Sequence, residues 1–462
     1  MKKLSIYLSF ACILTFVSCS SVVEGVNDNP NDLTTDEIDA GLYMNTPEIN
    51  SILIHCGDPS RRAAMWSGQL VGVSQLYLTD YLYQVTASSF DFDGYQSVIT
   101  QTQYIREAAP DNKLYQGMCR VMEAYLFGSY ASLFGDVPCS EVATGESYPA
   151  FDAQEDVFAY CQTILDEAIT NLEAETAPSY RQDYIFSGSP TKWCESAYTL
   201  KARFYMLTKE YDKAYAAALK GVSDSSNSML FVPLTDAVTT NKNRLWYVNN
   251  LNESLTTDGS YLMTLLASRE NSKTDETARI AYYTIHTVAN TNTGIAASTE
   301  PQRMITYEEN LLTLAEAALR SQSDGFTLAL SALNTLRAYL AAGGCVNSNF
   351  LTSSYAYDSY EASDFEAGGI ENSDGSLTAT RALLREIIEE RYISGFTTYM
   401  PFDDARRLRG TSESDVAVSI PFNTATATQH IERFLYPNDE ITGNINAPVD
   451  PGLYSPTPVN AN

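Results

Sequence analysis

Residues 193–222, WCESAYTLKARFYMLTKEYDKAYAAALKGV, decide the fold of this chain. Ala202, Tyr205 and Ala214 place a small, an aromatic and a small side chain at spacings of three and nine residues. This is the spacing at which the two antiparallel helices of a tetratricopeptide repeat touch. The polar residues 209–212, Lys-Glu-Tyr-Asp, separate the two helical halves. The stretch therefore predicts a helical hairpin and, with it, an all-α protein built on tetratricopeptide-like helix pairs.

Further amphipathic helices extend this scaffold on both sides of the hairpin. Apolar residues recur at helical spacing, and the turn 135–138, Gly-Asp-Val-Pro, ends the first of these segments. Small residues at Ala315, Ala318 and Ala329 predict a second, looser helix pair. The helices predicted in this way cover residues 114–134, 156–172, 307–320, 328–340 and 378–393.

Three long stretches between these helices show no sustained helical period. They are residues 57–100, 223–300 and 343–376, and they are rich in Ser, Thr, Asn, Gly and Tyr. Long loops on an ordered scaffold are the usual place for ligand binding. We therefore expect a helical scaffold with long irregular ligand-binding loops, and the uneven spacing of the helix pairs argues against a regular solenoid.

The composition restricts the classes of function. The chain has 29 Lys and Arg against 57 Asp and Glu, a net charge of -28, which repels the phosphate backbone of nucleic acids. Its 31 Tyr against three His supply many flat rings with hydroxyl groups and few general bases near neutral pH. We therefore expect no nucleic-acid partner, and a protein that binds rather than catalyses.

The beginning of the chain predicts export and lipidation. Two lysines precede an apolar run, 4–17, which is too short to span a membrane, and Cys19 follows it. We expect a lipoprotein signal peptide at 1–18, lipid on Cys19, a polar flexible tether at 19–36 and a single helical domain at 37–462. The alternative is an ordinary signal peptide with Cys19 present by chance.

The residues that usually carry chemistry form no catalytic or metal motif. His55, His286 and His430 are isolated, and the six cysteines beyond Cys19 contain no CxxC pair. We expect neither a cofactor nor a metal, and mostly buried free thiols, with one or two disulfides as the open alternative. A glycosidase stays open as well, because its chemistry needs only two suitably spaced carboxylates.

Two segments place acids beside arginines near the end of the last predicted helix. They are residues 389–391, Glu-Glu-Arg, and residues 403–407, Asp-Asp-Ala-Arg-Arg. Charges of both signs so close in sequence usually pair with one another, so we expect them to fix the helix end. Recognition of an anion or a sugar by the arginines is the alternative.

Two clusters of aromatic residues in the predicted loops are the candidate ligand-binding residues. Stacking rings flanked by amide and hydroxyl groups suit a sugar, whose apolar face meets the ring while its hydroxyls find hydrogen-bond partners. Ordinary packing of the loops against the scaffold is the alternative for every one of them, and Trp193, within a predicted helix, is expected in the core. The candidates are Trp66, Tyr77, Tyr81 and Tyr83 in the first cluster, and Trp246, Tyr247 and Asn249 in the second.

The order and spacing of several longer stretches resemble the SusD/RagB family. This is a family of surface lipoproteins that capture nutrients for a TonB-dependent transporter in Gram-negative bacteria. The stretches that carry the resemblance are 120–141, 198–218 with its Ala-Arg-x-Tyr helix pair, 307–318, 387–409, and the closing segment 436–454.

The resemblance implies a protein that is displayed at the outer membrane and binds without catalysis. It implies capture of an oligosaccharide and delivery to a SusC-like TonB-dependent transporter. A peptide ligand is the alternative within the family, and a surface glycoside hydrolase is the alternative outside it. The ligand-binding residues of this family lie in variable loops, so the aromatic candidates rest on their chemistry alone.

Overall fold

The computed structural model of the protein describes residues 40–177, 180–351, 355–409 and 412–461. Helices dominate these residues, and the strands among them are two to four residues long. The predicted all-α fold class is confirmed. Cys19 and the predicted signal peptide and tether lie outside the described residues.

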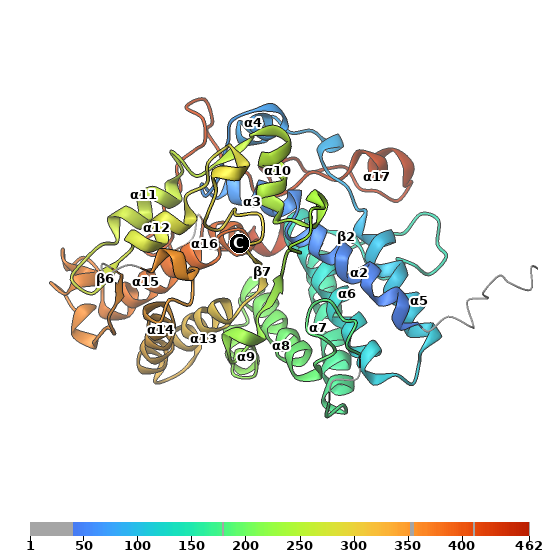
Figure 1. The fold of residues 1–462 in the computed structure, drawn as a ribbon, viewed down its shortest axis with the longest axis horizontal. Helices are drawn as coiled ribbons and strands as arrows, with labels where there is room; N and C mark the ends of the chain where they lie inside the picture. The colour runs from blue at the N-terminus through green and yellow to red at the C-terminus, as the bar shows by residue number, and fades with distance from the viewer. Residues whose placement is uncertain (1–39, 178–179, 352–354, 410–411, 462) are drawn as a thin grey trace, which may run out of the picture.

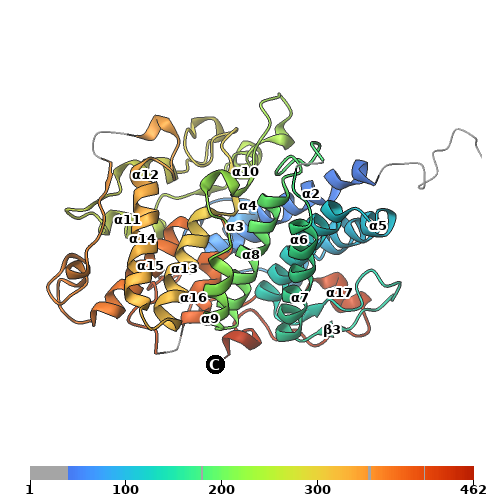
Figure 2. The same ribbon diagram turned by 90° about the horizontal axis from the view of Figure 1, so that it is seen from below.

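The scaffold is an arc of helices in which each member packs on the next. In Figure 1 they follow one another along the lower side of the molecule, and Figure 2 shows α8, α9, α13 and α14 side by side. All the helices predicted for the scaffold are present, with ends within a few residues of the expected ones. The helices are α6 (Lys113–Phe134), α7 (Gln154–Glu173), α8 (Pro190–Leu207), α9 (Tyr211–Ala218), α13 (Tyr307–Ser321), α14 (Gly325–Ala341) and α15 (Ala379–Ser394).

The hairpin of α8 and α9 packs through the residues that predicted it. Ala202 is completely buried against the alanines of α9, and Ala214 is completely buried in a second small cluster shared with α13. Tyr205 is half-buried and borders both clusters. The turn between the helices is closed by a hydrogen bond from Glu210 N to Tyr205 O at 2.8 Å. Small residues therefore let the two backbones approach, as the spacing predicted.

The stretches predicted as long loops contain short helices, which corrects the expectation for 57–100 and 223–300. Most of these helices have seven to nine residues, about two turns, which is too short for a helical period to be visible in the sequence. In Figure 1, α4, α10, α11 and α12 lie on the side of the molecule opposite α9, α13 and α14. The remaining helices are α2 (Gly41–His55), α3 (Asp58–Trp66), α4 (Gln75–Tyr81), α5 (Thr100–Ala108), α10 (Arg244–Asn252), α11 (Tyr261–Ser268), α12 (Thr277–Tyr283), α16 (Met400–Leu408) and α17 (Asn438–Gly443).

Four antiparallel two-stranded ladders tie distant loops together. The first of them pairs Val71 with Thr256 and so joins the segment after α3 to the segment after α10. Single helical turns fill much of the rest, among them the π-helical turn η3 (Tyr95–Ile99) before α5 and η6 (Ala289–Thr291) beside α10. The ladders are β1 (Val71–Gly72) with β5 (Leu255–Thr256), β2 (Val137–Pro138) with β3 (Phe151–Asp152), β4 (Met229–Phe231) with β7 (Gln302–Ile305), and β6 (Thr274–Asp275) with β8 (Ala356–Tyr357).

The charge-rich ends of α15 and α16 pair with one another and with α13. Arg391 Nε lies 2.8 Å from Asp404 Oδ2, and Arg407 donates to both Asp404 and Glu316 from within the core. Three guanidinium groups hold the pKa of Glu316 below its usual range, although burial acts to raise it. The interpretation of these segments as structural ion pairs is confirmed for the described residues.

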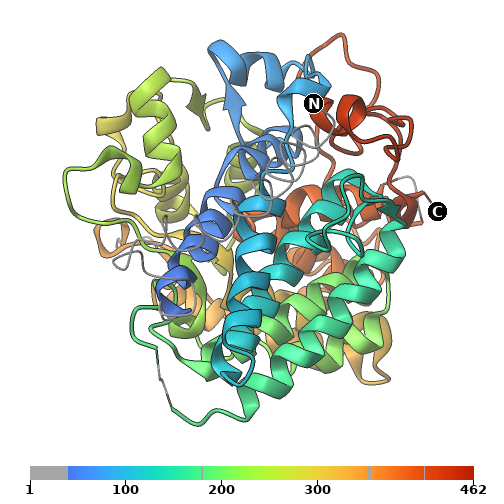
Figure 3. The same ribbon diagram turned by 90° about the vertical axis from the view of Figure 1, so that its right-hand side faces the viewer.

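The core contains the residues that the helical pattern placed there. Trp193 is completely buried, and its indole Nε1 donates to Asp183 Oδ2 at 2.8 Å. The six cysteines of the described residues are free, and five of them are buried. The C-terminal segment ends beside α7, where Val459 N donates to Gln154 Oε1 at 3.0 Å (Figure 3).

Candidate ligand-binding surface

Helix α10 carries three of the predicted site residues, and two asparagines fix its ends. Asn243 caps the first turn, because its side-chain oxygen accepts from Leu245 N and Trp246 N. At the other end Asn249 donates to Leu255 O at 2.9 Å and to His286 O at 3.0 Å. The Asn249 oxygen also accepts from two backbone N–H groups, and the residue is 1% exposed. Asn249 is therefore a positioning residue, which corrects its prediction as a ligand contact.

Two clefts border α10. Arg244, at the start of the helix, lines a cleft of about 360 Å³, which we call the arginine cleft. The turn η6, which packs on α10, contributes to a larger cleft of about 940 Å³, which we call the threonine cleft. The arginine cleft is lined chiefly by α2, α3, η3 with the segment before it, α6 and Arg244. The threonine cleft is lined by Thr256, Thr257, Thr284, Thr287 and Thr291, with Val73, Asp258, Gly259, Met263, Ile280, Ile285, His286 and Val288.

The predicted residue Tyr77 bonds to Arg61 and Asp58, which line the arginine cleft, although Tyr77 itself does not line it. Arg61 Nε donates to the Tyr77 hydroxyl at 2.9 Å, and that hydroxyl donates to Asp58 Oδ1 at 2.5 Å. Arg61 also forms an ion pair with Asp58. Burial, reinforced by the Asp58 charge, raises the pKa of Tyr77 to about 12, so the phenol keeps its proton. With 5% exposure, Tyr77 orients Arg61 and Asp58 and offers little ring surface to a ligand.

Trp66 is a core residue, which corrects its prediction as a stacking platform. It is 2% exposed, and its ring contacts the rings of Phe90, Phe402 and Phe434. Its Nε1 donates to the carbonyl oxygen of Asp80 at 2.9 Å. The short helix α3, which the sequence pattern did not predict, is buried over most of its surface and carries Trp66 inward.

Tyr81 and Tyr83 lie together, and neither lines the arginine cleft or the threonine cleft. The Tyr83 hydroxyl accepts from Asn423 N at 3.2 Å, and Asn423 Nδ2 donates to the Tyr81 carbonyl at 3.1 Å. Tyr83 is 8% exposed and Tyr81 is half-buried. These tyrosines therefore hold the segment around residue 423 against the turn after α4.

Tyr247 lies beside Arg244 on α10, although it does not itself line the arginine cleft. It is half-buried, and the Arg244 guanidinium lies over its ring, 4.3 Å from the centroid. Trp246 is 8% exposed and donates from Nε1 to Asn290 Oδ1 at 3.3 Å, so it fixes η6 against the helix. The structure thus connects Tyr77 and Tyr247, one from each predicted cluster, to the arginine cleft through Arg61 and Arg244, although neither tyrosine lines it.

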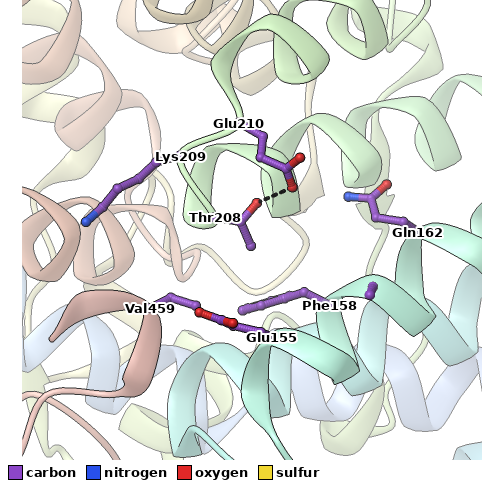
Figure 4. A pocket seen from close by; sticks show the side chains of 8 residues that line it. Glu155, Phe158, Gln162, Thr208, Lys209, Glu210 and Val459 are labelled. Carbon is purple, nitrogen blue, oxygen red and sulfur yellow. Dashed lines mark hydrogen bonds between the residues drawn. The ribbon is translucent and has the colours of Figure 1, made fainter. Parts of the chain in front are cut away.

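A third hollow lies on the scaffold. It has a volume of about 320 Å³ and is formed by α7, the turn between α8 and α9, and Val459 near the C-terminus. Figure 4 shows Glu155 and Gln162 of α7 on one side of it, and Thr208 bonded to Glu210 on the other. No predicted site residue lines it.

The arginines of the cleft are the site residues that sequence reasoning missed. Arg61 and Arg62 lie on α3 and Arg244 on α10, inside stretches that showed no helical period. The only local signal is a Pro at the start of α3 and an Asn before α10, both of which favour a helix start.

His286 borders the threonine cleft, whereas His55 is stacked on Tyr125 in the core, where burial lowers its pKa to about 3.

Comparison with known protein families shows that one family model matches most of the chain. A SusD-like family model, described as "Starch-binding associating with outer membrane", matches residues 45–400. The search of curated proteins finds no match. Among the described residues, no helix is long and apolar enough to cross a membrane.

Solved structures share the fold at low sequence identity. A SusD/RagB family protein from Bacteroides thetaiotaomicron is 20% identical, with a TM-score of 0.64 over 88% of this chain and 95% of that one. A SusD homolog from Bacteroides fragilis is 17% identical, with a TM-score of 0.66 over 92% and 99%. A chitin-binding SusD homolog from Flavobacterium johnsoniae is 15% identical, with a TM-score of 0.63 over 91% and 99%.

Proposed function

The chain belongs to the SusD-like family of starch-binding proteins that associate with the outer membrane, and on that premise we propose that it captures an oligosaccharide at the surface around α10. The family resemblance of the sequence is thereby confirmed. The proposed role is binding without catalysis, at a surface made of α10, the arginine cleft and the threonine cleft. A relative described as chitin-binding supports a saccharide as the ligand class.

The observation that carries the proposal is that one short helix connects two clefts of different chemistry, because Arg244 lines the first and the turn η6, which packs on the helix, lines the second. On one side, Tyr247 and Arg244 offer a flat, partly exposed cation–π pair. On the other, five threonines and Asp258 offer hydroxyl and carboxylate groups beside apolar surface from residues such as Val288. A saccharide needs both kinds of surface, because its C–H faces prefer apolar groups and its hydroxyls need polar partners.

Delivery completes the proposed function. We propose that lipid on Cys19 holds the protein at the cell surface, that residues 37–462 form one domain, and that the captured ligand passes to a SusC-like TonB-dependent transporter. The family's association with the outer membrane supports this arrangement. Pull-down of the tagged protein from its native membrane in mild detergent should recover a large β-barrel partner, and repeated recovery of the protein alone would count against the partnership.

A direct comparison of ligand classes tests the proposal. The full protein, purified in mild detergent, is titrated calorimetrically with malto-oligosaccharides, chito-oligosaccharides, acidic oligosaccharides and mixed tetrapeptides. We expect saturable binding of a saccharide that is recovered uncleaved. Binding of the peptides alone would favour the peptide alternative, and release of new reducing ends would favour a glycoside hydrolase.

A further inference from the structure

We propose that the arginine cleft receives an anionic group of the ligand, so that the captured saccharide is an acidic one bearing carboxylate or sulfate groups. This inference rests on the proposed function and narrows its ligand class. Carboxylate and sulfate groups share the same chemistry, because each is a charged oxyanion that a guanidinium group can hold. Arg244 is the residue to which the anionic group is assigned.

Arg244 lines the cleft without a carboxylate partner among the described residues. Its Nη1 donates to the carbonyl oxygen of Thr240 at 3.3 Å, its Nε is buried without a hydrogen-bond partner, and its Nη2 makes no hydrogen bond within the described part of the chain. The other two arginines of the cleft are paired, Arg61 with Asp58 and Arg62 with Asp80. Arg244 is thus the arginine of the cleft wall that makes no ion pair, although the Asp58 carboxylate, which pairs with Arg61, also acts on it.

The surroundings of Arg244 raise the free energy of its charged form. Burial, and after it the positive charge of Arg61, lower the pKa of Arg244 against the opposing effects of Tyr247 and Asp58, and the guanidinium stays protonated at neutral pH. An anion beside it would relieve both the desolvation and the like-charge repulsion, because charge-assisted hydrogen bonds to oxyanions are the strong ones. The ring of Tyr247 beneath the guanidinium limits its movement and keeps its polar edge available.

Buried arginines elsewhere in the described residues are compensated in one of two ways. Most buried ones face carboxylates, as Arg203 faces Glu309 and Arg279 faces Glu390. Arg337 has no carboxylate partner in the described residues, but it donates to the backbone carbonyls of Lys273 and Asp358 and lines none of the clefts described above. Arg244 combines an unpaired charge with a position in a cleft wall, in a chain whose net charge is -28.

The rest of the cleft suits the neutral part of a sugar. Arg62 is 4% exposed, and its two Nη groups make no hydrogen bond within the described residues although Asp80 neutralises its charge. Asp91 and Asp93 are exposed at the Arg62 end and can accept from hydroxyl groups. Burial raises the pKa of Asp91, and the nearby charges of Asp93, Arg62 and Asp58 act on it as well.

The test compares anionic and neutral saccharides on the full protein and on variants at Arg244. The probes are oligogalacturonates, which carry carboxylates only, carrageenan oligosaccharides, which carry sulfates only, and malto-oligosaccharides, which are neutral. Arg244→Gln removes the charge, Arg244→Lys keeps it without the planar fork, and Arg181→Gln removes an exposed arginine outside the cleft. Thermal melting of each variant confirms that it is folded.

We expect the wild type to bind one of the two anionic probes at least about tenfold more tightly than the neutral one, with affinity that falls as salt is added. Arg244→Gln should weaken that binding by roughly ten- to a hundredfold, Arg244→Lys by less, and Arg181→Gln should leave it unchanged. The preferred anionic probe tells carboxylate from sulfate.

Two results would overturn the inference. The first is that neutral saccharides bind at least as tightly as both anionic probes. The second is that a folded Arg244→Gln variant keeps the wild-type affinity for the anionic probe. Either result would exclude an acidic saccharide as the ligand and would leave the proposed function unaffected. Absence of binding to every saccharide would contradict the proposed function itself, and the inference with it.

Discussion

The Arg244 guanidinium lies over the Tyr247 ring, with 4.3 Å between the guanidinium carbon and the ring centroid. The two residues are three positions apart on α10, so they share one face of a helix whose start is fixed by Asn243. Arg244 brings a charge to the wall of the arginine cleft, and Tyr247 holds a flat ring beside that charge. The pair is the element of the surface on which saccharide binding should depend most.

Removal of the ring should weaken binding without unfolding the protein. Tyr247→Ala removes a half-buried ring and frees Arg244, so we expect the affinity for the captured saccharide to fall by about three- to tenfold. The melting temperature should change little, because the ring is only partly in the core. Calorimetric titration measures the affinity, and Tyr148→Ala, which removes an exposed tyrosine from the loop between β2 and β3, is the matched control. Equal losses in the two variants would argue against a role for this ring.

Trp66→Ala should instead destabilise the fold. The side chain is 2% exposed among three phenylalanine rings, and truncation of such a residue leaves a cavity that costs about 3 to 5 kcal/mol. Urea unfolding followed by far-UV circular dichroism should show the midpoint moving to lower urea. A variant of wild-type stability that had lost ligand binding would reinstate Trp66 as a ligand contact.

The long helices were predictable because each has enough turns for its apolar stripe to appear in the sequence. α6 and α7 have 22 and 20 residues, and the alanines of the α8–α9 hairpin mark the contact directly. α10 has nine residues, with the order Trp-Tyr-Val-Asn-Asn inside it, so no periodicity identifies it. Its cap at Asn243 is a signal that the sequence contained and that periodicity alone did not reveal.

For the candidate site, the sequence predicted the type of residues and the protein family, but not which residues are exposed to a ligand. Burial of Trp66 depends on Phe402 and Phe434, more than 300 residues away in sequence, and no local pattern reports such contacts. Asn249 looked like a polar ligand contact, but its amide is used by backbone groups that only the folded chain brings near. Arg244 was missed because contacts across the whole fold determine which arginine lacks a carboxylate partner, and the sequence alone does not show those contacts.

Stability should fall as the pH rises from about 5 to above 8. Arg269 faces the carboxylates of Glu276, Glu386, Glu389 and Glu390, and with Arg279 it cannot neutralise all four. Burial raises the pKa of Glu386 from 4.5 to about 8, so the folded state holds a proton that the unfolded state releases. The stability from this group is therefore present below about pH 4.5 and is lost as the pH rises towards 8.

Glu386→Gln provides the check. Urea unfolding between pH 5 and 8.5 should show the free energy of unfolding of the wild type falling by at least about 1 kcal/mol, and a smaller fall in the variant. Glu390, whose pKa is held near 2 by Arg279 and Arg269 against the effect of burial, acts only below about pH 4.5 and does not obscure this window. A wild type that is equally stable, or more stable, at pH 8.5 would contradict the assignment.

Cys19→Ala should release the protein from the membrane. Cys19 lies one residue beyond the apolar run 4–17 of the predicted export signal, and no described helix can span a bilayer, so attachment should depend on lipid at this residue. Labelling with radioactive palmitate and fractionation of the cells measure the two consequences. Cys194→Ala, which changes a cysteine on the scaffold, is the control and should keep both the label and the membrane location. A Cys19→Ala variant that kept both would rule out this anchor.

The location of a bound saccharide distinguishes the surface around α10 from the rest of the protein. The measurement is a crystal structure of the protein with the oligosaccharide that it binds most tightly in titration. We predict sugar density against α10, with a ring close to Tyr247 and an oxygen of the ligand within hydrogen-bond distance of the Arg244 guanidinium. Sugar density confined to the scaffold, for example in the hollow between α7 and the α8–α9 turn, with none against α10, would contradict the assignment of this surface.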